Sequence, residues 1–304
     1  MPIKIDNLLP AKHNLELENI FVMNESRATM QDIRALKILL LNLMPTKVET
    51  ETQMLRLLSN SPLQVDVELL QVATHEVKNT SKEYLLKFYK TFDDIKDEKF
   101  DGMIVTGAPV EMLPFEDVDY WDELCQIFDW AKTHVYSTYN ICWGAQASLY
   151  HHYKIPKYQL DDKMFGIFKC KILDIYHPLL RGFSDVFNMP HSRHTEVRKE
   201  DIALVKDLQI LAYSDMAGVC IVADMDCRNF FCMGHSEYDH DTLAREYFRD
   251  KNRGMDINIP YNYFPDDDPL KTPPITWRGE GSLLMQNWLN YFVYQRTPYD
   301  LSQL

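Results

Sequence analysis

The chain has 304 residues, of which 46% are hydrophobic and 12% aromatic, so it can bury a sizeable core. Its formal net charge of −13 at pH 7 excludes binding to nucleic acid or an anionic membrane through a general basic field. The sequence contains no apolar run of about 18 residues and no apolar segment near Met1. We therefore expect no membrane span and no signal peptide, and a cytoplasmic location.

The first half of the chain alternates between strand-like and helix-like segments. Continuous apolar runs predict buried strands, and amphipathic spacing predicts helices. In chain order we expect a strand at 36–43, a helix at 47–60, a strand at 65–72, a helix at 81–89, a strand at 100–106, a helix at 117–131, and a strand running directly into a helix within 133–153. Thr46 and Glu49 have the spacing of a capping box, and Ser81 is placed to cap the second helix. This alternation predicts an open, mostly parallel α/β sheet with helices on both faces.

The second half of the chain is richer in strands. The expected elements are strands at 164–173, 208–213, 218–223 and 229–233, and helices at 241–251 and 281–295. Residues 258–276, rich in proline and aspartate, are expected to be irregular but ordered. Residues 1–34 carry little periodic signal and are expected to wrap the domain or a partner subunit. We expect one domain over 1–304, with an N-terminal extension (1–34), an α/β core (35–251) and a C-terminal extension (252–304).

Cys142 lies between a strand-like segment (135–141) and a helix-like segment (143–153), with almost no loop. A sharp strand-to-helix turn lifts a side chain out at the carboxyl edge of a sheet, which is the geometry of a nucleophile elbow. The helix N-terminus carries partial positive charge and favours thiolate over thiol. On local pattern alone, a nucleophile and an inert buried cysteine are equally good interpretations of Cys142.

The six cysteines of the chain show no Cys-x-x-Cys pair and no zinc-ligand spacing with histidine. We therefore predict reduced thiols and no metal site. Cys170, Cys220 and Cys232 lie in apolar, strand-like runs and are expected to be small core residues.

His235 follows an apolar strand and a glycine, and Glu237 lies two residues further on. In an extended segment residues i and i+2 point to the same side, so both side chains can face one site. His235 would then act as the base for a cysteine nucleophile, and Glu237 would fix its tautomer. The alternative is a core histidine beside a surface glutamate.

An acyl transfer also needs donors for a developing oxyanion. The backbone N–H of Trp143, next to Cys142, is suitably placed, and the turn at 107–111 can supply a second donor. The alternative for that turn is a plain strand ending.

Two short motifs, Cys-Trp-Gly-Ala-Gln at 142–146 and Gly-His-Ser-Glu at 234–237, resemble the class I glutamine amidotransferase signature. Longer stretches make the chain similar, over essentially its whole length, to the homoserine O-acyltransferases of methionine biosynthesis; these stretches are 106–110, 190–193, 234–238, 261–265, 287–291 and 297–300. One departure is Ser236, where the amidotransferase signature and many relatives have proline. The resemblance implies a glutamine-amidotransferase-like fold and no resident cofactor.

The resemblance also implies a ping-pong mechanism. Cys142 would take an acyl group from acyl-coenzyme A as a thioester, with His235 as base and Glu237 as its partner. The hydroxyl of L-homoserine would then attack the thioester. By matching positions, Arg249 would hold the substrate carboxylate, and further contacts would come from Lys163, Ser192 and, in a less defined role, Lys47. The family suggests a homodimer.

In this family a glycine at position 111 accompanies succinyl-coenzyme A and a glutamate accompanies acetyl-coenzyme A; this chain has Glu111. Two like charges about 4 Å apart cost roughly 4 kcal/mol at an effective dielectric of about 20, so Glu111 would repel the succinyl carboxylate. The resemblance therefore favours acetyl-coenzyme A as co-substrate and O-acetyl-L-homoserine as product. The alternatives are a succinyltransferase, a glutaminase-type amidotransferase and a non-catalytic binding protein on the same fold.

Overall fold

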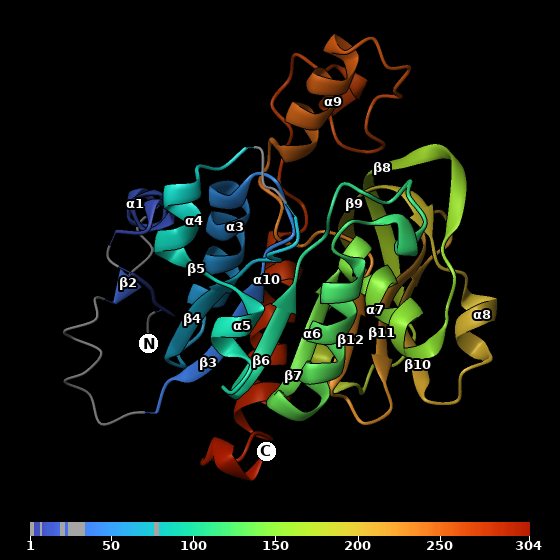
Figure 1. Ribbon diagram of the computed structural model, residues 1–304. Helices are drawn as coiled ribbons and strands as arrows, with labels where there is room; N and C mark the ends of the chain where they lie inside the picture. The colour runs from blue at the N-terminus through green and yellow to red at the C-terminus, as the bar shows by residue number, and fades with distance from the viewer. Residues whose placement is uncertain (1–2, 7, 19–21, 24–33, 76–78) are drawn as a thin grey trace.

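The computed structural model describes residues 3–6, 8–18, 22–23, 34–75 and 79–304, and one 12-stranded sheet organises them (Figure 1). Its parallel part contains β1 (Ile3–Lys4), β2 (Val22–Met23), β3 (Leu36–Leu41), β4 (Val65–Leu70), β5 (Tyr89–Lys90), β6 (Phe100–Val105), β7 (Val135–Ile141) and β12 (Asn229–Cys232). Its antiparallel part contains β8 (Tyr158–Ile172), β9 (Val186–Glu196), β10 (Leu208–Ser214) and β11 (Gly218–Asp224), and joins at β12. The predicted open, mostly parallel α/β sheet is confirmed.

The strand order locates the crevice of the sheet. Along the sheet the strands run β2-β1-β4-β3-β6-β7-β12-β11-β10-β8-β9, with β5 beside β4. The chain moves outward from β3 to β4 and then returns past β3 to β6. Open α/β sheets bind ligands beyond the carboxyl ends of their strands at such a reversal. The ends of β3, β6, β7 and β12 therefore define the region in which a site is expected.

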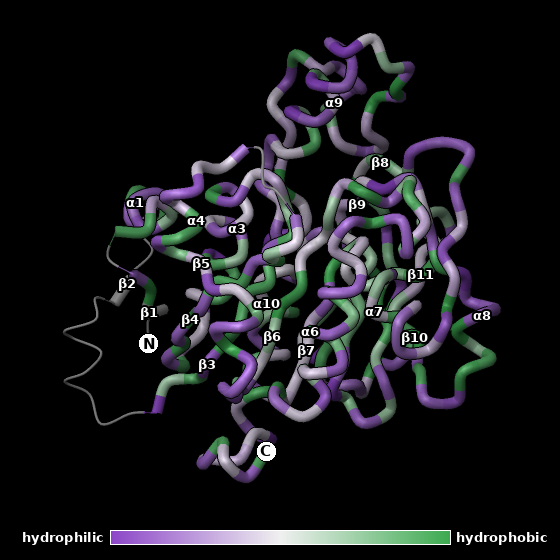
Figure 2. The backbone as a smooth tube through the Cα atoms, viewed as in Figure 1, coloured by the Kyte–Doolittle hydropathy of each residue, from purple (hydrophilic) through white to green (hydrophobic). Residues whose placement is uncertain are grey.

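Helices cover both faces of the parallel part. On one face lie α1 (Pro10–Leu17), α3 (Lys47–Ser59) and α10 (Arg278–Asn287), and on the other α6 (Trp121–His134) and α7 (Trp143–Tyr153). In β3, Ile38 and Leu40 join the first core and Leu39 and Leu41 the second, because alternate side chains of a strand point to opposite faces. The remaining helices are α4 (Lys82–Phe88), α5 (Phe92–Ile95), α8 (Lys199–Ala203) and α9 (Thr242–Asn252). Figure 2 shows the hydrophobic residues concentrated in the sheet and the layers on it.

Helix α9 stands beyond the edge of the sheet at which the parallel strands end, above β8 (Figure 1). It is held there by a small apolar cluster that includes Phe165, Leu243, Tyr263 and Trp277. The segment after α9 also packs directly against β8 at Gly166. Only glycine allows this contact, since a Cβ at this residue would lie 2.4 Å from the backbone of Tyr261. The sheet therefore carries α9 over the region where its strands end.

Several sequence expectations needed correction. The capping box at Thr46 is wrong, because the Thr46 side chain makes no capping hydrogen bond, although α3 does begin at the next residue. The capping role of Ser81 is confirmed by a 3.2 Å bond from the Tyr84 N–H to its hydroxyl. The helix expected at 117–131 runs instead from Trp121 to His134, after a 3-10 turn over Phe115–Asp117.

Two further elements differ from expectation. Strand β9 was not expected from any local pattern, although it carries the 190–193 motif. The C-terminal helix begins at Arg278 rather than at 281, and it continues as a π-helix over Trp288–Tyr294.

The expectation that residues 1–34 wrap a domain or a partner falls largely outside the described residues. Within the described part, β1 pairs with β4, and α1 joins the core that also contains α3. Among the helices that the structure describes, none is both long and apolar enough to span a bilayer.

Candidate active site

Cys142 occupies a strained elbow between β7 and α7. Its backbone has φ 49° and ψ −116°, a conformation that non-glycine residues rarely adopt. The strand ladder and the helix together impose it, because the Cys142 N–H donates to the Cys232 carbonyl at 2.7 Å and the Cys142 carbonyl accepts from the Gln146 N–H at 3.0 Å. Strain of this kind persists only where the surrounding structure fixes it, and it is frequent at functional sites.

The end of β6 and the turn after it pack closely against the elbow. A Cβ at Gly144 would lie 2.5 Å from the Thr106 carbonyl oxygen, so only glycine lets the first turn of α7 pack against the end of β6. A Cβ at Gly107 would lie 3.4 Å from Cys142 Cβ and 3.6 Å from His235 Cε1. The turn after β6 therefore runs directly alongside the cysteine and the histidine.

The structure brings Cys142, His235 and Glu237 together in a nearly dry site. All three are buried. His235 Nδ1 and Glu237 Oε1 lie 2.7 Å apart, and Cys142 is close enough to act on the pKa of the ring. The bond to Glu237 forms within a turn after β12 rather than along an extended strand, so the expected backbone geometry was wrong although the pairing holds.

The His235 ring is held in place and electrostatically favoured as imidazolium. Its backbone N–H donates to the Pro190 carbonyl at 2.8 Å, and Tyr238 stacks on the ring at 4.2 Å between centroids. Burial lowers the pKa of His235. The negative charges of Cys142 and Glu237 and their hydrogen bonds raise it by more, so that the pKa lies well above its usual value. This environment favours the protonated form of the His235 ring.

A cavity of about 300 Å³ at the expected strand ends is lined by Cys142 and His235. Of the positions singled out from the sequence, its walls contain Glu111, Lys163, Ser192 and Arg249. The structure thus gathers into one cavity four side chains that are far apart in the chain.

Glu111 faces this cavity from the turn after β6. Its Oε1 accepts a hydrogen bond from the His194 N–H at 3.1 Å, and its backbone carbonyl accepts one from Lys157 Nζ at 2.6 Å. Burial raises the pKa of the Glu111 carboxyl above its usual value, although the bond from His194 acts in the opposite direction.

Helix α9 contributes a set of charges above the cysteine. Lys163 Nζ lies 3.1 Å from Glu246 Oε2 and 3.5 Å from Asp250 Oδ2, and the Ser192 hydroxyl donates to Glu246 Oε2 at 2.5 Å. Arg249 binds both oxygens of Asp250, through Nε at 2.7 Å and Nη2 at 3.0 Å. Lys163 and Ser192 are therefore fixed by acidic groups that the sequence had not singled out.

The two auxiliary residues expected from the sequence, Trp143 and Lys47, do not line the cavity that contains Cys142. The Trp143 indole is fully buried against Phe115 and Tyr120, while its backbone N–H begins α7 and so has no acceptor within the helix. Lys47 lies in a neighbouring cavity of about 240 Å³ and donates to the Asn42 carbonyl. Burial lowers the pKa of Lys47 to about 8.

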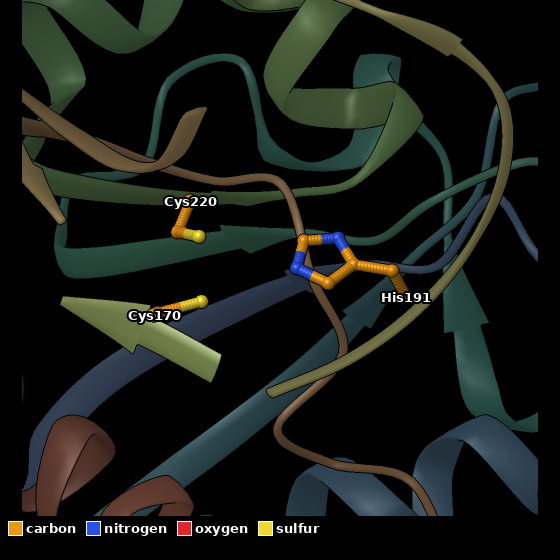
Figure 3. Close-up of side chains that lie close together, drawn as sticks. All are labelled: Cys170, His191 and Cys220. Carbon is orange, nitrogen blue, oxygen red and sulfur yellow. The ribbon is translucent and has the colours of Figure 1, made fainter. Parts of the chain in front are cut away.

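A buried cluster of Cys170, His191 and Cys220 places possible metal-ligand atoms within 4.8 Å of one another (Figure 3). The fully buried Arg193 guanidinium interacts electrostatically with His191 and Cys220, and its positive charge would repel a divalent cation there. Burial raises the pKa of the Cys170 thiol and lowers that of His191, which favours the neutral form of each. The cluster is accounted for as core packing, and the absence of a metal site stays a prediction.

The family model described as homoserine O-succinyltransferase matches residues 2–299. The chain belongs to this family of homoserine O-acyltransferases. It is 61% identical to the homoserine O-acetyltransferase of Clostridium acetobutylicum over 99% of this chain and 100% of that one. It is 60% identical to the homoserine O-acetyltransferase of Acetivibrio thermocellus over the full length of both. This homoserine O-acyltransferase is thus an enzyme of the acyltransferase class.

Solved structures confirm the glutamine-amidotransferase-like fold of this homoserine O-acyltransferase. A glutamine amidotransferase from Thermotoga maritima superposes with a TM-score of 0.54 at 11% identity, covering 86% of this chain and 100% of that one. A protein from Thermoplasma acidophilum described as part of a GMP synthase gives a TM-score of 0.50 at 19% identity, over 71% and 92% of the two chains. At these identities the likeness concerns the fold alone.

Sequence reasoning missed the residues that support the site. Gln146 and Thr195 exchange two buried hydrogen bonds, at 3.1 and 2.8 Å, which tie α7 to the end of β9. The glutamine of the Cys-x-Gly-x-Gln motif was a usable signal for this contact. For Glu246 and Asp250 there was none, since acidic residues on a polar helix are ordinarily solvated.

Proposed function

We propose that this chain is a homoserine O-acetyltransferase that acts through an acetyl thioester on Cys142. The observation that carries the proposal is Cys142 at a strained elbow, beside a His235 that is paired with Glu237. Cys142 and His235 face a cavity whose wall also contains Glu111. The full-length likeness to proteins named homoserine O-acetyltransferase supports the substrates, L-homoserine and acetyl-coenzyme A.

In the first half-reaction the Cys142 thiolate attacks the acetyl carbonyl of acetyl-coenzyme A. The backbone N–H of Trp143, and one from the 107–111 turn, stabilise the oxyanion of the tetrahedral intermediate. The carbon–sulfur bond to coenzyme A then breaks, and the departing thiolate takes the proton held by His235.

In the second half-reaction neutral His235 removes the proton of the homoserine hydroxyl, and the oxygen attacks the thioester. The bond to Cys142 breaks, and O-acetyl-L-homoserine leaves with the thiolate–imidazolium pair restored. Glu237 stabilises the imidazolium in each half-reaction through the 2.7 Å bond to Nδ1. Arg249 would bind the substrate carboxylate.

Acetyl rather than succinyl transfer rests on Glu111. The family model carries a succinyltransferase description, whereas the relatives are named acetyltransferases, so the family alone does not decide the donor. An ionised carboxylate in a small cavity repels a succinyl carboxylate and leaves room for an uncharged acetyl group.

Intact-protein mass spectrometry tests this proposal. The enzyme is mixed with acetyl-coenzyme A or succinyl-coenzyme A without homoserine, and Cys142→Ala serves as the control. We expect a mass increase of one acetyl group (~42 Da) on the wild type only, which L-homoserine then discharges. A succinyl adduct would keep the mechanism and contradict the donor. Turnover without any adduct would contradict the thioester.

A glutaminase is the second candidate, suggested by the amidotransferase-like motifs at 142–146 and 234–237. The same incubation with L-glutamine, followed by an ammonia assay, separates it from the acyltransferase. We expect no ammonia above the level of the Cys142→Ala control.

The homodimer implied by the resemblance stays a prediction. The chain mass is 35.8 kDa, so sedimentation equilibrium distinguishes a monomer from a particle of twice that mass.

A further inference from the structure

Burial does little to hold the tip of the turn that carries Glu111. Val110, at its start, packs against the core, and its carbonyl accepts the Leu113 N–H at 3.1 Å. Beyond Val110, however, Met112 and Leu113 are 54% and 45% exposed. Ordering a chain segment costs conformational entropy, which buried apolar side chains usually offset. The tip of this turn therefore needs other contacts to keep one conformation.

Lys157, immediately before β8, binds the tip of the turn at two points. Its Nζ donates to the Glu111 carbonyl at 2.6 Å and to the Leu113 carbonyl at 2.5 Å. An ammonium has three N–H donors, so it can bind both carbonyls at once, and hydrogen bonds from a charged donor are the stronger kind. The same ammonium lies 4.4 Å from the centroid of the Phe115 ring, a cation–π contact. One side chain thus holds the main chain on both sides of Met112.

The carboxylate of Glu111 is held separately, by β9. Its Oε1 accepts the His194 N–H at 3.1 Å. The two anchors of Glu111 are neighbours in the sheet, because Tyr158, directly after Lys157, pairs with Glu196 of β9. Glu111 is therefore fixed at its backbone and at its carboxylate by one pair of antiparallel strands.

Lys157 lies behind the turn rather than in the cavity. Among the described residues, the lining of the cavity that contains Cys142 includes Glu111 but not Lys157. Lys157 can therefore affect a bound acyl donor only through the turn. Burial lowers the pKa of Lys157 to about 8, although Glu111 and Glu116 act in the opposite direction, so the ammonium form predominates at neutral pH.

A carboxylate excludes a second carboxylate only while it stays in place, because the repulsion between two charges falls with their distance. We propose that Lys157 is a positioning residue for donor selection: it fixes the turn that carries Glu111, and so keeps the Glu111 carboxylate where a succinyl group would bring its own. This inference rests on the proposed function, in which Glu111 selects the acyl donor. It adds a residue outside the cavity to the specificity of the enzyme.

The test compares kcat/KM for succinyl- and acetyl-coenzyme A, since damage that affects both donors alike cancels in their ratio. Lys157→Met removes the ammonium and keeps a side chain of similar length, whereas Lys157→Arg keeps the charge and the N–H donors. Lys87→Met is the matched control, because Lys87 is an exposed lysine of α4 that also lies over an aromatic ring, that of Phe88.

We expect Lys157→Met to raise the succinyl-to-acetyl ratio about 10-fold, the lower end of the range for a charge-assisted hydrogen bond. The effect should be smaller than that of removing Glu111, because the carboxylate is still present although its position is less fixed. Lys157→Arg should stay closer to the wild type than Lys157→Met. Lys87→Met should leave the ratio unchanged.

The Glu111→Gly protein separates positioning from an independent effect of Lys157. If Lys157 acts through the Glu111 carboxylate, adding Lys157→Met to Glu111→Gly should leave the ratio as it is in Glu111→Gly alone. A residue that acts independently of Glu111 would instead change the ratio by the same factor in both backgrounds.

An unchanged ratio in Lys157→Met, or an equal rise in both backgrounds, would overturn the inference. A lower ratio would also overturn it, because Lys157 would then attract the succinyl carboxylate. If Lys157→Met does not fold, Lys157→Gln, which removes the charge and keeps a polar group, is judged by the same outcomes. A wild-type enzyme that prefers succinyl-coenzyme A would instead overturn the proposed donor, and the inference with it.

Discussion

Among individual residues, burial decides which charges the site can use. Cys142, His235 and Glu237 are each less than 10% exposed, so their mutual interactions are only weakly screened by water. Glu111, in the wall of the cavity that Cys142 and His235 line, is also affected by burial, which raises the pKa of its carboxyl. The chemistry therefore depends on a few charges rather than on the overall charge of the chain.

Replacing Glu111 tests charge exclusion at the donor site. Glu111→Gln keeps the size and removes the charge, whereas Glu111→Gly removes both. We expect the ratio of kcat/KM for succinyl- over acetyl-coenzyme A to rise on the order of 100-fold in Glu111→Gly, and by part of this in Glu111→Gln. Steady-state kinetics with both donors measures the ratio. An unchanged ratio in Glu111→Gly would mean that Glu111 does not select the donor.

The same carboxyl predicts a pH dependence. Because burial raises its pKa, Glu111 loses its charge as the pH falls through a value above the usual range for glutamate. The succinyl-to-acetyl ratio of the wild type should therefore rise as the pH is lowered. In Glu111→Gln the side chain at position 111 no longer titrates, so only the carboxyl group of succinyl-coenzyme A can still change its charge. The succinyl-to-acetyl ratio of this variant should therefore vary less with pH than that of the wild type. Parallel profiles for the two proteins would contradict this assignment.

Glu237 should matter through the His235 ring. Glu237→Gln removes the negative charge that faces Nδ1 at 2.7 Å, so the imidazolium loses stabilisation and its pKa falls. We expect single-turnover acetylation of Cys142 to slow by about 100-fold or more. Glu83→Gln, a change at an exposed glutamate of α4, is the control, and its single-turnover rate should match that of the wild type. Wild-type rates in Glu237→Gln would remove Glu237 from the mechanism.

Among the helices and strands, the elbow exists because α7 starts in contact with β6. The first turn of the helix touches the Thr106 carbonyl at Gly144, and the side chain of Gln146 ties the same turn to β9. This packing holds the Cys142 backbone in its strained conformation. Contacts of α7 with β6 and β9 therefore hold Cys142, the proposed nucleophile, at the elbow.

Gly144→Ala should disturb this contact. The added Cβ would lie 2.5 Å from backbone oxygen, which cannot move aside as a flexible side chain can. We expect a loss of about 1–3 kcal/mol in the free energy of unfolding, together with slower acetylation of Cys142. Urea denaturation measures the stability change.

Gly279→Ala in α10 is the matched control, because nothing lies within 4 Å of the added Cβ. It should be neutral, or stabilising by up to about 1 kcal/mol, since alanine is the better helix former. Equal stability of Gly144→Ala and the wild type would show that α7 can shift away from β6 at little cost.

Across the molecule, an ion pair between the buried Asp101 and the partly buried Arg34 joins segments far apart in the chain. Arg34 donates to both oxygens of Asp101, at 2.9 and 2.7 Å, and also to the Pro298 carbonyl at 3.1 Å. The Asp101 carboxylate accepts the Lys37 N–H as well. The residues preceding β3, the strand β6 and the C-terminal segment are thus held at one point.

Asp101→Asn should destabilise the protein by about 3 kcal/mol, since it leaves a partly buried guanidinium without its counter-charge. Asp93→Asn, at the exposed pair with Lys96, is the control and should give no measurable change. Urea denaturation of the three proteins measures the difference. Equal midpoints for Asp101→Asn and Asp93→Asn would show that the buried pair adds nothing beyond a surface pair.

Local sequence patterns were enough to predict the parallel α/β core and the strand-to-helix turn at Cys142, because apolar runs predict strands and amphipathic spacing predicts helices. They left the pairing of His235 with Glu237 open, and the pair forms in a turn rather than along an extended strand. The amidotransferase-like and acyltransferase-like motifs then indicated the family without any structure.

The strand β9, the position of α9 above the strand ends and the contacts of Glu246 became known only from the folded chain. Packing across the sheet brings β9 and α9 to a cavity formed by turns far away in the chain, and no local periodicity encodes such contacts. The capping box at Thr46 failed for a related reason, because the correct residue spacing does not supply the side-chain hydrogen bond. Local pattern selects which elements form, whereas the long-range burial of apolar surface selects which side chains meet.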